Sequence, residues 1–227
     1  MNKLLTTVFA LAVACVTLSA QAQKVTGNAA AGEKKIAMCM GCHGIIGYQT
    51  TFPEIYKVPK IAGQSATYIT AALTEYQEGD RKHPTMRAIA ASLSEQDIAD
   101  LAAYYSQLGV AEGDAPPPAV AAAPSEAVQA LIMRDKDNSC TKCHGANFNT
   151  PNDGTVPKLA GQHPDYLFAA LRAYKVGSGI ERGRSNGVMS GQAKKYSNAE
   201  LKELASYISS LPGDVKTVPE SRFHTEN

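Results

Sequence analysis

Two short stretches of the sequence carry the same reactive pattern, in which two cysteines are separated by two residues and a histidine follows directly. The stretch CMGCHG contains Cys39, Cys42 and His43, and the stretch CTKCHG contains Cys140, Cys143 and His144. This spacing is typical of the covalent attachment of c-type haem. Each thiol can form a thioether with one vinyl group, and the histidine is then placed to supply an axial nitrogen to the iron.

Two other kinds of site use a Cys-x-x-Cys pattern, namely a thioredoxin-like dithiol and half of a zinc site. A thioredoxin motif needs a βαβ context, and the sequence lacks the alternation of apolar and polar residues that predicts strands. A zinc site would require both cysteine pairs to meet, whereas each pair lies in its own half of a repeated sequence. We therefore expect two covalently bound haem c groups.

A second axial ligand is expected, because methionine opposite histidine raises the reduction potential of an electron carrier. Met86 and Met189 hold equivalent places in the two halves, which favours them as ligands. A methionine can also be flexible core filler, and His83 and His163 are alternative ligands. The repeat places no histidine opposite either of these two, which favours surface or helix-start positions for them.

Two prolines that follow the haem motifs are candidates for a supporting role. Pro59 lies in VPKIAG and Pro157 in VPKLAG. A carbonyl at either position could accept the Nδ1 proton of His43 or His144, which would fix the imidazole and tune its basicity. The alternative is a plain turn proline before a helix.

All of these residues lie in a tandem repeat. VPKIAGQSATYI in the first half matches VPKLAGQHPDYL in the second, and LSEQDIADLAAYYSQLG matches YSNAELKELASYISSLPG. Residues 109–127 are rich in Pro, Ala and Gly and lack the large apolar residues of a core, which predicts an extended linker. We expect one domain at residues 23–108 and a second domain of the same kind at residues 128–227.

Each half is expected to be a small all-α unit of three or four helices. Ser94 opens SEQDIADLAAYYSQL as an N-cap, and Ser197 with Glu200 forms a capping box at the start of SNAELKELASYISSL. The helices TYITAALTEYQEG and DYLFAALRAYKVG each end at a glycine. A domain of this size has a thin core, and a covalently held prosthetic group would supply the missing apolar filling.

The first residues predict export. Residues 1–22 combine a short positive start, an apolar run and Ala20 with Ala22 as a cleavage site, which is the pattern of a signal peptide. The alternatives are an uncleaved membrane anchor and lipidation at Cys15. The formal net charge is +1 without a basic stripe, so we expect no nucleic-acid partner.

The chain resembles the cytochrome c4 family, which are di-haem members of the class I cytochromes c. The resemblance rests on the two CxxCHG motifs, on PKIAGQ with PKLAGQ, on Met86 with Met189, and on LAAYY with LASYI. It implies two tandem class I cytochrome c domains related by a pseudo-twofold axis, with His–Met ligation in both. It also implies that the carbonyls of Pro59 and Pro157 orient the haem histidines.

The same resemblance implies a cellular role. Members of the family reside in the periplasm, often in loose association with the inner membrane. They pass electrons from a quinol-oxidising complex toward a terminal oxidase. In this sequence NFNTPNDG is shorter than its first-half counterpart, and GSGIERGRSNGVM lengthens the approach to Met189. The second haem pocket is therefore expected to differ from the first in exposure or potential.

Two alternative functions follow from the same motifs. One is the cytochrome subunit of a periplasmic dehydrogenase, such as a flavocytochrome sulfide dehydrogenase. The other is an enzyme, such as a di-haem peroxidase or a thiosulfate dehydrogenase, which needs an open haem or an unusual axial ligand. With both axial positions filled, and with no further cysteine after residue 22, we expect an electron carrier and not an enzyme.

Overall fold

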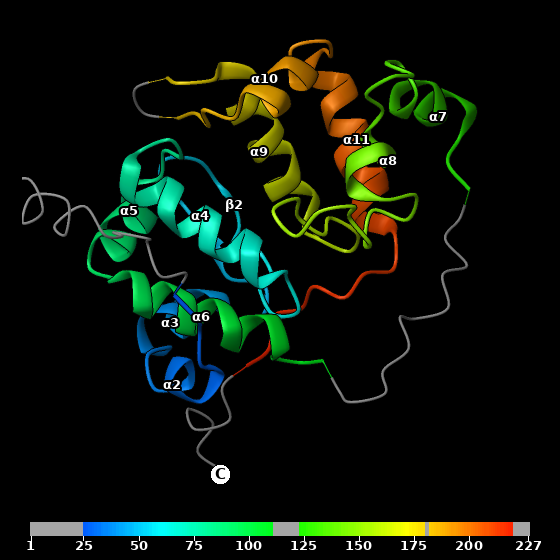
Figure 1. Ribbon diagram of the computed structural model, residues 1–227. Coiled ribbons are helices and arrows are strands. Elements are labelled where there is room, and N and C mark those ends of the chain that lie inside the picture. The colour runs from blue at the N-terminus through cyan, green and yellow to red at the C-terminus, as the bar shows by residue number, and fades with distance from the viewer. Residues whose placement is uncertain (1–24, 111–122, 180–181, 220–227) are drawn as a thin grey trace, which may run out of the picture.

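The protein consists of two helical halves that lie against each other (Figure 1). The computed structural model describes residues 25–110, 123–179 and 182–219. The signal peptide predicted for residues 1–22 lies outside the described residues, as do residues 111–122 of the predicted linker. Across the described ranges, no helix combines the length and the apolar character needed to cross a bilayer.

Five described helices and one short hairpin build the first half, so the expectation of three or four helices was too low. They are α2 (Ala29–Glu33), α3 (Ala37–His43), β1 (Gln49–Thr50), β2 (Tyr56–Lys57), α4 (Ala66–Glu78), α5 (Pro84–Ala91) and α6 (Glu95–Gln107). The antiparallel strands pair Gln49 with Lys57 and Thr50 with Tyr56. Strands of two residues are too short to produce an alternating pattern in a sequence, which is why the hairpin was not predicted.

The second half repeats the helices in the same order. They are α7 (Glu126–Ile132), α8 (Cys140–His144), α9 (Pro164–Val176), α10 (Gly187–Ala193) and α11 (Asn198–Ser210). Helix α7 starts within the last residues of the predicted linker, where the Ser125 hydroxyl caps it by accepting from the Val128 N–H. In the place of the β1–β2 hairpin, the second half has turns and irregular chain.

The four longest helices, α4 and α6 in the first half and α9 and α11 in the second, begin and end close to the residues that the sequence predicts. Ser94 and Ser197 are the N-caps of α6 and α11, and both helices have a complete capping box. In α6 the box is closed by Asp97, whose carboxylate accepts from the Ser94 N–H. Helix α4 ends at Gly79, whose φ of 85° lies in the left-handed region that glycine tolerates best.

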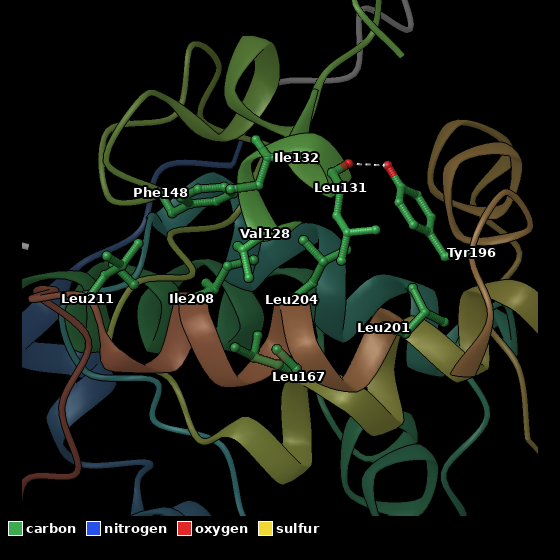
Figure 2. Packing of buried hydrophobic residues seen from close by; sticks show 12 residues of the cluster. Val128, Leu131, Ile132, Phe148, Leu167, Tyr196, Leu201, Leu204, Ile208 and Leu211 are labelled. Carbon is green, nitrogen blue, oxygen red and sulfur yellow. Dashed lines mark hydrogen bonds between the residues drawn. The ribbon is translucent and has the colours of Figure 1, made fainter. Parts of the chain in front are cut away.

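The larger of the two cores lies in the second half (Figure 2). One face of α11 carries a row of leucine and isoleucine side chains that point toward α7 and α9. Phe148 is 1% exposed and closes one end of this cluster. At the other end, Tyr196 is buried and its hydroxyl donates to the Leu131 carbonyl at 3.0 Å. This half therefore fills much of its interior with its own side chains.

The core of the first half is smaller and adjoins an open cavity. Its buried members are Ile36, Met40, Ile69, Leu101, Ala102 and Tyr105. Helix α2 packs on α6, and α4 packs on both α5 and α6. The same core contains Met40 of α3 with Leu101 and Tyr105 of α6, so it supports the helix that carries the first haem motif.

Two glutamines join the halves through reciprocal hydrogen bonds. The Gln64 side chain accepts from the Lys158 N–H at 2.9 Å and donates to the Lys158 carbonyl at 2.9 Å. The Gln162 side chain does the same with Lys60, at 3.0 and 2.9 Å. Both glutamines are buried. This exchange between equivalent residues is the local form of a pseudo-twofold relation between the halves.

The end of the chain also ties the halves together. After α11, residues 213–219 return to the first half, where the Lys216 N–H donates to the Ala62 carbonyl at 2.9 Å (Figure 1). The Lys216 ammonium reaches the Gly109 carbonyl at 2.9 Å, and Val215 is buried. The interface therefore includes a segment that has no counterpart in the sequence repeat.

Candidate functional site

The first half contains a cavity of about 370 Å³ that brings four of the predicted site residues together. Cys39, Cys42 and His43 line it from α3, and Met86 lines it from α5. Much of the remaining wall is aliphatic or aromatic and comes from α4, α5 and α6. A concave apolar site with two thiols and two iron-binding side chains has the donor set that a covalently attached haem requires.

A backbone carbonyl fixes the imidazole of His43 through its Nδ1 atom. Its Nδ1 lies 2.8 Å from the Pro59 carbonyl oxygen. Burial lowers the pKa of His43, although the bond to the Pro59 carbonyl opposes this shift. The neutral ring with its proton on Nδ1 leaves Nε2 as the free lone pair, which is the form that binds iron.

The second half repeats this geometry. His144 ends α8, is 6% exposed, and has its Nδ1 3.1 Å from the Pro157 carbonyl oxygen. Burial lowers the pKa of His144, again opposed by the carbonyl bond. Cys140 and Cys143 lie on the same short helix. The residues of the second motif therefore suit a haem by the same chemistry as the first.

The two methionines lie at equivalent positions near the start of equivalent helices. The Met86 N–H donates to the Nδ1 of His83, the N-cap of α5, at 3.3 Å. The Met189 N–H donates to the Oδ1 of Asn186, the N-cap of α10, at 3.0 Å. The alternative ligand His83 thus starts a helix and also lines the first cavity, while His163 is the N-cap of α9.

None of the four cysteines of the described chain forms a disulfide. Burial raises the pKa of Cys39 and of Cys140, so both sulfurs lie in apolar surroundings. Among the described residues, no three His, Cys, Asp or Glu side chains gather in the way that a bound metal ion requires. The cysteine pairs therefore do not combine into the shared zinc site considered above.

Several residues around the first cavity were not identified from the sequence. The Tyr105 hydroxyl donates to the Sδ atom of the buried Met40 at 3.3 Å, and Ile208 takes its place in the second half. Part of the cavity wall comes from the second half, including Leu159 and Tyr166. The repeat could have indicated Tyr105, since a hydroxyl opposite an isoleucine is a visible difference between the halves.

Comparison with known proteins decides the family. The family model for cytochrome c matches residues 29–109 and 126–212, one match in each half. Cytochrome c4 of Pseudomonas aeruginosa is 32% identical over 189 residues, which cover 82% of this chain and 89% of that protein. The chain belongs to the cytochrome c4 family. It is thus a di-haem electron-transfer protein with covalently bound haem c, and the enzyme alternatives fall away.

Two further similarities bear on the fold and on the partners. The crystal structure of reduced recombinant cytochrome c4 from Pseudomonas stutzeri matches with a TM-score of 0.61 and 31% identity, over 82% of this chain and 100% of that chain. This confirms the predicted all-α fold of two tandem cytochrome c domains. A thiosulfate dehydrogenase electron acceptor from Thiomonas intermedia is 29% identical over 203 residues, covering 88% of this chain and 90% of that protein.

Proposed function

We propose that each half of this cytochrome c4 holds one haem through two thioethers and two axial ligands. In the first half these are Cys39, Cys42, His43 and Met86, and in the second half Cys140, Cys143, His144 and Met189. The observation that carries the proposal is the repetition of one geometry, a motif histidine whose Nδ1 lies at hydrogen-bond distance from a proline carbonyl.

The protein side chains set the conditions for electron transfer. The carbonyls of Pro59 and Pro157 orient the two imidazoles and raise their basicity as ligands. As a second iron ligand, methionine would favour the reduced state, and the largely apolar wall of the first cavity would limit the access of water. When bound, haem supplies a one-electron ferric–ferrous couple. A histidine and a methionine from each half would hold the iron and would leave it no open position for a substrate.

The cellular role proposed for the protein is that of a periplasmic carrier in a respiratory chain. It would accept electrons from a quinol-oxidising complex and pass them toward a terminal oxidase, in loose association with the inner membrane. Membership of the cytochrome c4 family and the signal peptide predicted for residues 1–22 support this assignment.

Spectroscopy of the purified ferric protein tests the ligand assignment. The wild type is expected to contain two low-spin haems and to show the methionine-to-iron charge-transfer band in the red. Met86→Ala and Met189→Ala should each remove the contribution of one site and leave the other. Met133→Ala is the matched control, because Met133 follows α7 and has no equivalent in the first half. A high-spin, ligand-binding haem in the wild type would contradict the proposal.

A second candidate role is that of the cytochrome partner or subunit of a periplasmic dehydrogenase. The similarity to a thiosulfate dehydrogenase electron acceptor supports it. Purification from the native membrane and soluble fractions distinguishes the two roles. A dehydrogenase that copurifies at a fixed ratio and reduces the cytochrome favours the second role. A freely isolated cytochrome that is reduced by membranes supplied with quinol favours the first.

A further inference from the structure

The peptide unit between Pro59 and Lys60 is hydrogen-bonded at both of its polar groups. Its carbonyl oxygen lies 2.8 Å from the Nδ1 of His43, within the first half. Its N–H donates to the Oε1 of Gln162, a residue of the second half, at 3.0 Å. Because a peptide unit is planar and rigid, the direction of the carbonyl depends on where the N–H is held. The side chain of Gln162 therefore helps to direct the carbonyl toward His43.

The equivalent peptide unit of the second half is held in the same way. The Pro157 carbonyl oxygen lies 3.1 Å from the Nδ1 of His144. The N–H of the same unit belongs to Lys158 and donates to the Oε1 of Gln64, a residue of the first half, at 2.9 Å. Each motif histidine is thus connected, through a single peptide unit, to a glutamine of the other half.

The two glutamine side chains have little freedom to turn. Gln64 is 5% exposed and Gln162 is 4% exposed. Each Nε2 donates to a lysine carbonyl of the other half at 2.9 Å, that of Lys158 for Gln64 and that of Lys60 for Gln162. Each Oε1 also accepts from the N–H of the next residue in its own chain segment, at 3.0 Å in both cases. A buried amide whose donor and acceptor are both engaged is held in one orientation.

This arrangement affects the basicity of the imidazole as well as its direction. A peptide N–H that donates a hydrogen bond makes the carbonyl of its own unit a stronger acceptor, because hydrogen bonds in a chain polarise one another. A stronger acceptor at Nδ1 raises the basicity of the ring at Nε2, the atom available to iron. A more basic ligand stabilises ferric iron and lowers the reduction potential.

We propose that Gln64 and Gln162 are positioning residues that act across the interface. Gln162 supports His43, and Gln64 supports His144, each through the peptide unit whose carbonyl accepts from the histidine. Docking of the halves therefore completes the support of both imidazoles, and neither half has the whole of it alone. The inference rests on the proposed ligation of iron by the two motif histidines.

Proton NMR of the reduced full-length holoprotein, with the Nδ1 protons of the two motif histidines assigned, tests the inference. Gln64→Leu should move the Nδ1 proton of His144 to lower frequency, because its hydrogen bond weakens, and should leave that of His43 in place. Gln162→Leu should do the reverse. In a redox titration, the reduced-to-oxidised ratio of the affected haem should rise about threefold at a given potential, or about 30 mV, because the direct partner of the imidazole is retained.

Ser65→Ala is the matched control. It removes another hydrogen bond between the halves, which the Ser65 hydroxyl donates to the Gly154 carbonyl at 2.6 Å, and it leaves both peptide units as they are. Both Nδ1 signals should keep their wild-type positions in this variant. Gln64→Leu gives the sharper test, because Gln64 lines the first cavity. A purely local effect of this substitution would move the signal of His43, whereas an effect across the interface moves that of His144.

The inference is overturned if Gln64→Leu moves the signal of His43 instead, or if neither leucine variant differs from Ser65→Ala. If a leucine variant separates the halves, which sedimentation detects, Gln162→Glu decides, because a carboxylate keeps the accepting oxygen and accepts more strongly than an amide. It should move the His43 proton to higher frequency, and a shift to lower frequency or no shift also overturns the inference. A wild type without two low-spin, methionine-ligated haems would instead contradict the proposed function, and its visible spectrum shows this before any variant is made.

Discussion

The two halves share one plan of helices and yet differ around the haem motif. In the first half, six large apolar side chains near the motif are 42–76% exposed, namely Met38, Ile45, Ile46, Tyr48, Phe52 and Ile55. In the second half the corresponding loop is shorter, rich in Asn and Thr, and buries its one large aromatic residue, Phe148. Duplication has therefore kept the geometry of the motif histidines and their proline carbonyls, and allowed the surface and the core packing of each half to diverge.

The largest effect is expected from matched changes in the two cores. Leu101 and Leu204 are equivalent and 2% and 3% exposed, but Leu101 also lines the first cavity. Leu→Ala at either site should lower the free energy of unfolding by about 2–5 kcal/mol. We expect the larger loss for Leu204→Ala, which opens a void within the larger cluster, and a change in haem absorbance only for Leu101→Ala. Chemical denaturation followed by circular dichroism measures the free energy of unfolding of both variants, and the visible absorption spectrum reports on the haem. An equal or larger loss of unfolding free energy for Leu101→Ala would contradict the expected difference between the two cores.

An effect of intermediate size should test the symmetry of the interface. Gln64→Ala and Gln162→Ala each remove two hydrogen bonds to the backbone of a lysine in the other half. Because each bond contributes about 1 kcal/mol, each variant should lose about 2 kcal/mol of unfolding free energy. We expect the two single variants to lose equal amounts of unfolding free energy. If either substitution alone already separates the halves, the double variant should lose less than the sum of the two. Clearly unequal losses would show that one glutamine carries the interface.

The smallest effect concerns ion pairs at the surface. In the second half, the hydrogen bond from Lys195 lowers the pKa of Asp135 to about 2. The hydrogen bonds from Arg134 lower the pKa of Glu200 to about 2 as well. In the first half, the hydrogen bond from Lys35 lowers the pKa of Asp97 and Asp100. A lowered carboxyl pKa contributes stability above the unfolded-state value, and this contribution is lost as the pH falls through the folded-state value.

The melting temperature should therefore decline as the pH falls from about 4.5 toward 2, in both halves alike. Asp135→Asn should flatten part of this decline and reduce its dependence on salt. Asp153→Asn should flatten it without changing the salt dependence, because hydrogen bonds with Thr155, rather than a cation, lower the pKa of Asp153. Thermal unfolding across this pH range, at low and high salt, is the measurement. A decline that is unchanged in Asp135→Asn would show that the ion pair of Asp135 with Lys195 does not contribute to the acid sensitivity.

Local signals predicted the helices and the haem motifs well. Ser94 and Ser197 cap α6 and α11 as expected, because a capping box needs only residues a few positions apart. The equivalence of Met86 and Met189 came from the repeat, which requires no knowledge of the fold. The assignment of both as ligands remains a prediction, as does the role of the proline carbonyls.

The contacts between the halves could not be predicted in this way. Gln64 and Gln162 stand in the repeated motif, but their exchange of hydrogen bonds depends on how two domains dock, which no local pattern encodes. Arg81 and Arg184 would normally be expected at the surface, because a charged side chain is rarely fully buried unless it is paired. Their burial becomes visible only once the tyrosines of α4 and α9 are placed around them.

The return of residues 213–219 to the first half has a consequence for the order of assembly. The Ala62 carbonyl accepts from the Lys216 N–H, so the edge of the first half is completed by a segment that follows the whole of the second half in the chain. The helices of the first half come earlier in the chain, so they can form before this edge is completed, but the segment that completes it is available only after α11 has been made. Truncation after α11 should therefore lower the stability of the first half, although the truncated segment follows the second half in sequence.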